Sequence, residues 1–212
     1  MNDVARVVVQ RNKVATSVLA ALMLHGRNAR TGVAPDFDWL AGLLSYIDEI
    51  VIRQHYRDEE TWLLKPIEKQ MPELRPRLAR MRRDHIGSAG YCVRIAEALT
   101  HWKKGWPNAI DYYLDNARDC FRLSASHGQL LRRSVLPVAE RCFTAAQWQG
   151  ASAALAHSMD SVSLGRDRAE VETALCRRMG RSTPPATPGR VDRDHGRPTV
   201  ATPGVEFAGR EA

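Results

Sequence analysis

The feature that most constrains the fold is a helical repeat of apolar residues, which recurs in four long segments while strand-like alternation is almost absent. Short stretches rich in Gly, Pro or Asn separate the segments, which cover residues 4–25, 36–70, 73–103 and 108 to beyond 138. Four helices of this length joined by short connections predict an all-α fold, an up-down-up-down four-helix bundle. Pro137 falls late in the fourth segment and is expected to kink or end that helix.

The chain changes character after the fourth segment. Thr144 and Gln147 have the spacing of a capping box and predict a fifth helix, and a weaker helical pattern follows at 165–179. From Arg181 onward Pro, Gly, Thr and Arg dominate with little to bury, which is typical of a disordered tail. The expected parts are the bundle over 1–143, trailing helices packed on it over 144–180, and the tail over 181–212.

Composition indicates the expected compartment of the protein and the kinds of partner it would have. The hydrophobic fraction of 44% supports a sizeable core, and neither an unbroken run of 18 apolar residues nor a signal-peptide pattern is present, so we expect a cytoplasmic protein with no membrane partner. The cysteines are widely spaced and are expected to be small core residues or free thiols: Cys92, Cys120, Cys142 and Cys176.

The net charge of +7 does not favour a nucleic-acid partner. The arginines gather at 75–83 and in the tail, and no zinc-finger spacing or RNA-binding sheet pattern accompanies them. A solvated basic surface is therefore the simpler interpretation.

Two polar residues interrupt the inward stripe of the second segment. Its spacing reaches His55 and then Glu59 after the apolar positions Leu40, Leu44, Ile47 and Val51. Residues four apart share one face of a helix, so this imidazole and this carboxylate are expected to point into the core. The third and fourth segments each place one histidine, His85 and His127, in the middle of a similar stripe.

The three histidines are expected to lie at one height in the bundle. In a helical hairpin, residues equidistant from the turn are level, because every residue rises by the same 1.5 Å. His55 lies about 17 residues before the turn at 71–73 and His85 about 13 after it. His85 and His127 each lie about 21 residues from the turn at 105–107. The imidazoles should therefore meet within about one helical turn.

Taken alone, each histidine is most simply interpreted as a core residue bonded to a backbone carbonyl. Glu59 alone is most simply interpreted as a carboxylate at the rim of the core. Together they place several polar groups in a low-dielectric core, where unpaired groups are costly. Metal coordination satisfies them all at once, and His/carboxylate sets suit iron, zinc or manganese. A dry pocket lined by Trp62, Leu63, Met81 and Cys92 is expected beside them. No nucleophile with a positioned base and no phosphate-binding glycine loop indicates a hydrolase or a kinase.

Three stretches of the chain resemble the hemerythrin family of HHE cation-binding domains. The matching text is HYRDEETWLL, RRDHIGSAG and SHGQLLRRSVLPVAERCFTAAQWQGASAAL. The resemblance spans residues 4–160 and depends on the ordered set, since a single His-x-x-x-Glu is a weak motif. It implies a four-helix bundle with a non-haem di-iron centre that binds or responds to dioxygen, and it puts four residues at ligand positions: His55, Glu59, His85 and His127.

Some positions depart from the family pattern. Leu131 and Arg132 stand where the family's fourth helix usually carries a bridging carboxylate, and Ala89 stands four residues after His85, where some members have His or Glu. The guanidinium of Arg132 would be electrostatically unfavourable beside a metal ion unless its side chain turned outward.

The first helix departs as well. Arg11 and Asn12 occupy the region of the family's first-helix ligand motif. His25 is expected at the loop end of the bundle, where a histidine suits the negative end of a helix dipole, rather than at the level of the other histidines.

The leading hypothesis is a hemerythrin-like protein with a mononuclear or di-iron site that binds or senses dioxygen, nitric oxide or peroxide, rather than an enzyme for an organic substrate. A second hypothesis is a haem-binding bundle with core histidines as axial ligands. A third is a metal-free interaction scaffold, in which Arg11 or Arg132 pairs with Glu59 and the tail contacts a protein partner.

Overall fold

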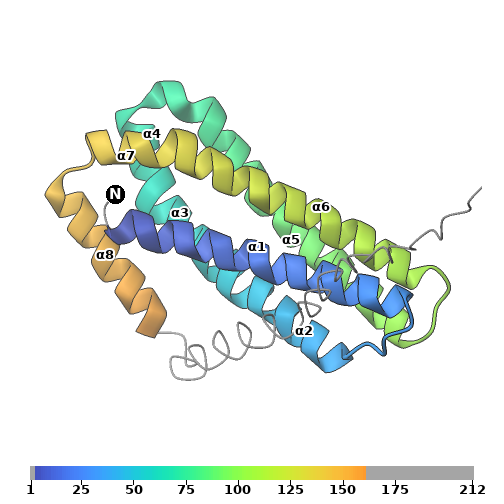
Figure 1. Cartoon of the computed structure of the whole chain (residues 1–212). Helices are drawn as coiled ribbons and strands as arrows, with labels where there is room; N and C mark the ends of the chain where they lie inside the picture. The colour runs from blue at the N-terminus through green and yellow to red at the C-terminus, as the bar shows by residue number, and fades with distance from the viewer. Residues whose placement is uncertain (1–2, 161–212) are drawn as a thin grey trace, which may run out of the picture. The chain divides into compact units, whose positions relative to one another are not determined.

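The computed structural model describes residues 3–160, and these residues contain helices and no strand (Figure 1). This confirms the all-α prediction for that part of the chain. The helical pattern at 165–179, the tail over 181–212 and Cys176 lie outside the described residues. Cys92 and Cys120 are buried free thiols and Cys142 is a half-buried one, as expected.

Four long helical segments follow one another along the chain, and a shorter helix comes after them. The first segment is α1 (Asp3–Arg30). The second is a continuous run of α2 (Phe37–Tyr46), η1 (Ile47–His55), α3 (Tyr56–Glu59), η2 (Glu60–Leu64) and α4 (Lys65–Gln70). The third joins η3 (Pro72–Leu74) to α5 (Arg75–Lys103). The fourth joins α6 (Ala109–Leu130), η4 (Leu131–Val135) and α7 (Leu136–Cys142), and α8 (Ala145–Asp160) is the fifth helix.

The long segments pack around a shared core. Both α1 and α5 pack along α6, and η1 contacts α1 and α5 on the opposite side. Figure 1 shows α1 and α6 lying side by side over much of their length. Near the N-terminus, α8 packs against α1. Each segment therefore has apolar neighbours on its inward face, as its sequence stripe requires.

The start of α8 follows from its sequence. The backbone N–H of Thr144 donates to Gln147 Oε1 at 2.9 Å, and the backbone N–H of Gln147 donates to Thr144 Oγ1 at 3.3 Å. These reciprocal bonds satisfy donors that the first turn leaves free, and they confirm the predicted capping box.

One expected helix end is wrong, and the proline that was expected to kink or end the fourth segment does not end it. The first helix was expected to end at residue 25 but continues to Arg30, because Gly26 lies in a close contact with α6 rather than in a turn. The left-handed glycine that follows this helix is Gly32, with φ of 95°. The fourth helical segment continues past Pro137 to Cys142. The π-helical turn η4 lies just before Pro137. Such a turn interrupts the regular hydrogen-bond ladder, so the helix can continue although proline has no N–H to donate.

Helix α1 is long and apolar enough to cross a membrane by length and composition. Half of its most apolar window is nevertheless buried against the other helices. The same composition is typical of a helix at the centre of a bundle.

A matched pair of glycine substitutions tests the packing of α1 on α6. A Cβ at Gly26 would lie 2.7 Å from Leu114 Cδ2 and 2.9 Å from the ring of the fully buried Tyr113. Gly26→Ala should therefore lower the free energy of unfolding by about 2 kcal/mol. A Cβ at Gly42, in the middle of α2, meets nothing within 4 Å. Gly42→Ala should raise that free energy by about 0.5–1 kcal/mol in the same denaturant titration.

Candidate metal centre

A layer of polar side chains separates two apolar clusters in the core. One cluster includes Leu19, Leu43 and Tyr113, and the other includes Leu64 and Leu131. The buried polar residues between them are Asn12, His55, Glu59, Asp84, Ser88, Ser124 and His127. Since burying polar groups costs free energy, a whole layer of them in the core calls for mutual bonding or for a ligand.

Glu59 is the hub of this layer. Its Oε1 lies 3.1 Å from His55 Nε2, and its Oε2 lies 3.1 Å from His85 Nε2 and 3.0 Å from His127 Nε2. Glu59, His55 and His127 are each only 1% exposed. The prediction that these four side chains meet in the core is confirmed, while their binding of a metal stays a prediction.

Irregular helix frames the hub. His55 ends the π-helical η1, Glu59 ends the single α-helical turn of α3, and the π-helical η2 begins at the next residue. A π-helical turn widens the helix and rotates the side chains that follow it, and such turns are frequent at functional sites. The sequence did not predict these π-helical turns, because the inward residues Ile47, Val51, His55 and Glu59 keep an ordinary helical spacing of four across them.

The charges of the cluster reinforce one another. Burial opposes the ionisation of Glu59, but the charges and hydrogen bonds of His55 and His127 hold its pKa well below the usual range. Burial alone would lower the pKa of His127, whereas Glu59 and Asp84 raise it to about 9. In the metal-free protein at neutral pH, the core therefore holds a carboxylate paired with an imidazolium.

The first helix contributes Asn12, which the sequence only located near the site. Asn12 Nδ2 donates to Glu59 Oε1 at 3.0 Å, lies 3.0 Å from His55 Nε2, and donates to the carbonyl of Val8 at 3.2 Å. The neighbouring Arg11 pairs with Asp58 at 2.9 Å. Arg11 therefore does not pair with Glu59 as the scaffold hypothesis expected.

Three further residues surround the cluster, and sequence reasoning missed them. The ring of Tyr56 stacks on His85 with 4.0 Å between centroids, and its hydroxyl bonds to Ser88 Oγ at 3.2 Å. Asp84 Oδ2 lies 3.7 Å from His127 Nδ1. Tyr56 and Asp84 directly adjoin predicted ligands in the sequence, but only the irregular turn at η1 brings Tyr56 inward.

His25 lies where expected, whereas the expected pocket forms only in part. His25 accepts a hydrogen bond from Trp39 Nε1 at 3.1 Å, outside the cluster. Leu63 and the 38% exposed Trp62 line the small cavity that reaches Glu59. Met81 and Cys92 are buried but do not line this cavity, and Cys92 lines a separate groove with Leu44. Arg132 lines a surface groove beside Asn12.

Three of the four predicted ligands, Glu59, His85 and His127, have donor atoms close enough together for one coordination shell, and His55 is not part of that group. Neighbouring ligands of an octahedral ion with bonds of about 2.1 Å lie about 3.0 Å apart. The Nε2 atoms of the three histidines lie 3.0–3.1 Å from a Glu59 oxygen. The ligand atoms of Glu59, His85 and His127 all lie within 4.8 Å of one another, so this buried group could hold a metal ion.

A second observation fits a metal. The Nδ1 atoms of His55 and His127, and Oδ2 of Asp84, are buried without a hydrogen-bond partner among the described residues. Histidines that bind metals through Nε2 commonly donate Nδ1–H to a carboxylate. A shift of less than about 1 Å would make that bond between His127 and Asp84.

The site does not fit a haem. Glu59 Oε2 fills the space between His85 Nε2 and His127 Nε2, where the iron of a bis-histidine haem would lie. The cavity that reaches Glu59 has a volume of about 10 Å³, which has no room for a macrocycle.

Comparisons of the chain with protein-family models, with curated proteins and with solved structures found no match.

Proposed function

We propose that this chain is a hemerythrin-like four-helix bundle that holds one metal ion, iron in the first instance, through His55, Glu59, His85 and His127. The observation that carries the proposal is the convergence of three imidazoles from three helical segments on a single buried carboxylate. His/carboxylate sets of this kind suit iron, manganese and zinc.

Each group of residues around the cluster has its own role in the proposal. The four proposed ligands define the ion's position, Asp84 lies behind His127, and Tyr56 stacks against His85. The two apolar clusters above and below the layer keep water away. When bound, the ion supplies open coordination positions for a small ligand such as dioxygen, nitric oxide or peroxide. We propose binding or sensing of that ligand rather than turnover of an organic substrate.

Metal loading of the purified protein tests the proposal. After incubation with Fe(II), Mn(II) or Zn(II) and dialysis, we expect about one ion per chain by elemental analysis. At a free metal concentration 100 times Kd, binding adds about 2.7 kcal/mol of stability, which raises Tm by about 8 °C. Two irons per chain with oxo-bridge absorption would show that other groups complete a di-iron centre. A metal-free protein whose Tm ignores all three ions would contradict the proposal.

Metal binding should release a proton. His127 is protonated in the metal-free protein because its pKa is about 9, whereas a metal ligand must be neutral. Glu59 is already ionised because its pKa is well below the usual range. Calorimetric titrations at pH 7.5 in buffers of different ionisation enthalpy should therefore show release of about one proton per ion. A binding enthalpy that does not change with the buffer would contradict this prediction.

A metal-free scaffold is the second candidate, and one observation favours it. Glu59 already accepts hydrogen bonds from Asn12 and interacts with three histidines, so the carboxylate is fully satisfied without an ion. In that case the polar layer would serve to specify the pairing of the helices. The loading experiment separates the two candidates, because a scaffold gains no stability from metal.

A further inference from the structure

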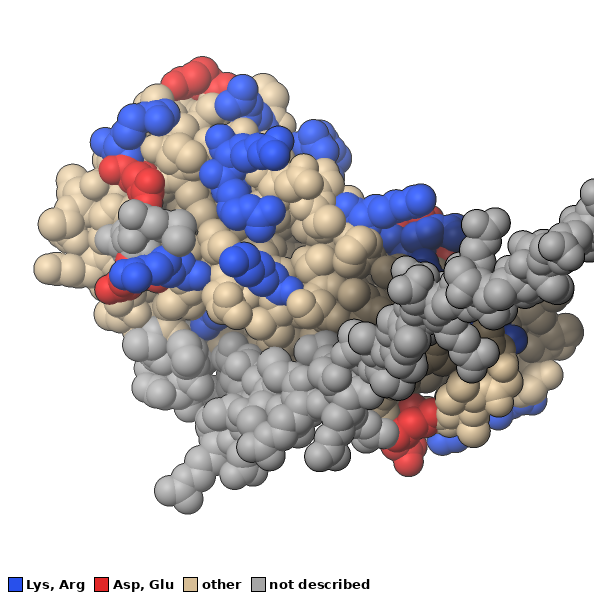
Figure 2. Space-filling model, in the orientation of Figure 1, with Lys and Arg blue, Asp and Glu red and all other residues tan. Residues whose placement is uncertain are grey.

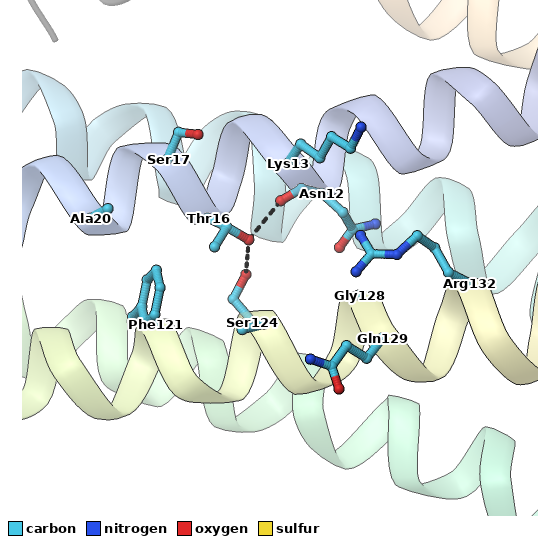
Figure 3. A pocket seen from close by; sticks show the side chains of 11 residues that line it. Asn12, Lys13, Thr16, Ser17, Ala20, Phe121, Ser124, Gly128, Gln129 and Arg132 are labelled. Carbon is cyan, nitrogen blue, oxygen red and sulfur yellow. Dashed lines mark hydrogen bonds between the residues drawn. The ribbon is translucent and has the colours of Figure 1, made fainter. Parts of the chain in front are cut away.

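A groove of about 470 Å³ lies between α1 and α6, on the outer side of the polar layer (Figure 3). Asn12 forms part of its wall and also bonds to Glu59, so a single side chain separates the groove from the buried cluster. Cavities of this volume are in the range of small-molecule sites.

One end of the groove is cationic. Lys13 and Arg132 line it near Asn12, both are exposed, and neither has an ion-pair partner within residues 3–160. No acidic residue lines the groove. In Figure 3 the guanidinium of Arg132 points toward Asn12. Figure 2 shows, in the orientation of Figure 1, that Lys and Arg outnumber acidic residues on the visible face of the molecule. An anionic group would therefore be attracted to this end.

Two hydroxyl groups in the middle of the groove already donate their hydrogens within the protein. Thr16 Oγ1 donates to the carbonyl of Asn12 at 2.8 Å, and it lies 3.3 Å from Ser124 Oγ. Because the Thr16 hydroxyl has only one hydrogen, the Ser124 hydroxyl must be the donor between the two. Both hydroxyl hydrogens are therefore in use, so these two groups offer an anion no donor. The side-chain amide of Gln129, which also lines the groove, is a neutral donor only.

The other end of the groove is apolar. Ala20 and Phe121 line it, and Figure 3 places them at the opposite end from Arg132. Gly128 lies beside Asn12 at the cationic end, where a Cβ would lie 3.9 Å from Arg132 Nη1 and 3.9 Å from Asn12 Cβ. The absence of a side chain at Gly128 keeps this end open.

From this polarity we propose that the groove binds an organic monocarboxylate with an apolar tail. The carboxylate pairs with Arg132 beside Asn12, and the tail extends over Thr16 and Ser124 toward Phe121. The ammonium of Lys13 points away from α6 in Figure 3, so Lys13 contributes only its charge at this end. The proposal is independent of the metal, although the headgroup would lie next to Asn12 and hence one side chain away from Glu59.

Calorimetric titration of the metal-free full-length protein with octanoate tests this site, with octanol as the matched uncharged probe. Octanoate should bind at least about tenfold more tightly than octanol, because charge-assisted hydrogen bonds to arginine are roughly twice as strong as neutral ones. Arg132→Gln should weaken octanoate binding about tenfold, while the control Arg133→Gln, which does not line the groove, should leave it unchanged.

A second variant tests independently whether octanoate binds in this groove. Gly128→Leu should abolish octanoate binding by filling the cationic end, and a far-UV spectrum and Tm like those of the parent would show that it folds. Equal affinities for octanoate and octanol, unchanged binding by Arg132→Gln, or full binding by Gly128→Leu would each overturn the proposal. Since no metal is present, these outcomes are distinguishable from a failure of the proposed metal site.

Discussion

Glu59→Gln should abolish metal retention, because the two carboxylate oxygens of Glu59 lie 3.0–3.1 Å from Nε2 of all three histidines. An amide offers one weak neutral oxygen where the carboxylate offers two charged ones, so we expect metal affinity to fall about 100-fold or more. Breaking a buried pair also leaves His127 with only the more distant carboxylate of Asp84, which should lower the stability of the metal-free protein by about 3 kcal/mol. Elemental analysis after dialysis and denaturant titrations measure the two effects.

The adjacent residue supplies the matched control. Glu60 is half-buried and its carboxylate receives hydrogen bonds from Arg82 at 2.9 and 3.1 Å, away from the histidines. Glu60→Gln should therefore keep full metal content and lose at most about 1 kcal/mol of stability. If Glu59→Gln retained metal as well as Glu60→Gln does, the carboxylate at the centre of the cluster would not be a ligand.

The order and extent of the helices were largely predictable from the sequence. The second segment was expected over 36–70 and is helical from Phe37 to Gln70, with the Asp36 side chain accepting from Trp39 N at its start. Such segments are predictable because burial of one face imposes a period on the sequence. The fourth segment was expected to begin at 108, and α6 begins at Ala109; the preceding Asn108 adopts φ of 60° and its side chain makes no capping bond.

Gly26 shows why one helix end was wrong. A glycine after a helical stripe is commonly a C-terminal cap, but it also occurs where two backbones approach closely. The second role depends on Tyr113 and Leu114, which are distant in the sequence. Local pattern alone therefore cannot distinguish a glycine that ends a helix from one that lets α6 approach.

Part of the candidate site was predictable, because helix geometry fixes how far along the bundle a residue lies and which face of its helix it occupies. His55, His85 and His127 were expected to be level, and each lies 3.0–3.1 Å from Glu59. Asn12 was expected only by position, because an amide does not stand out in a sequence as a histidine does. The inward position of Tyr56 depends on the π-helical turns, which follow from tertiary packing rather than from local propensity.

The satisfied state of Glu59 has a consequence for metal binding. Asn12 Nδ2 lies 3.0 Å from His55 Nε2, the atom that a metal would use, so an ion must displace this contact. The Asn12 amide also donates to Glu59 Oε1, so metal and Asn12 compete for that oxygen. The side chain at position 12 should consequently set how strongly the chain prefers the metal-bound state.

Asn12→Asp should strengthen the preference for the metal-bound state. In the metal-free protein it puts a second buried carboxylate beside Glu59, which should lower stability by about 2 kcal/mol because like charges disfavour ionisation. With metal, the same carboxylate becomes an additional anionic ligand. We therefore expect metal affinity to rise about tenfold and the metal-induced increase in Tm to exceed that of the parent protein.

Asn116→Asp is the control for this change. Asn116 is also buried, and its Oδ1 accepts from Arg94 Nε at 3.0 Å, so an aspartate keeps the acceptor and faces a cation. Its metal-induced rise in Tm should equal that of the parent. A response of Asn12→Asp equal to that of Asn116→Asp would mean that α1 does not border the ion. A larger response would extend the metal site to all four helical segments, since α1 would then contribute beside the segments that carry the histidines.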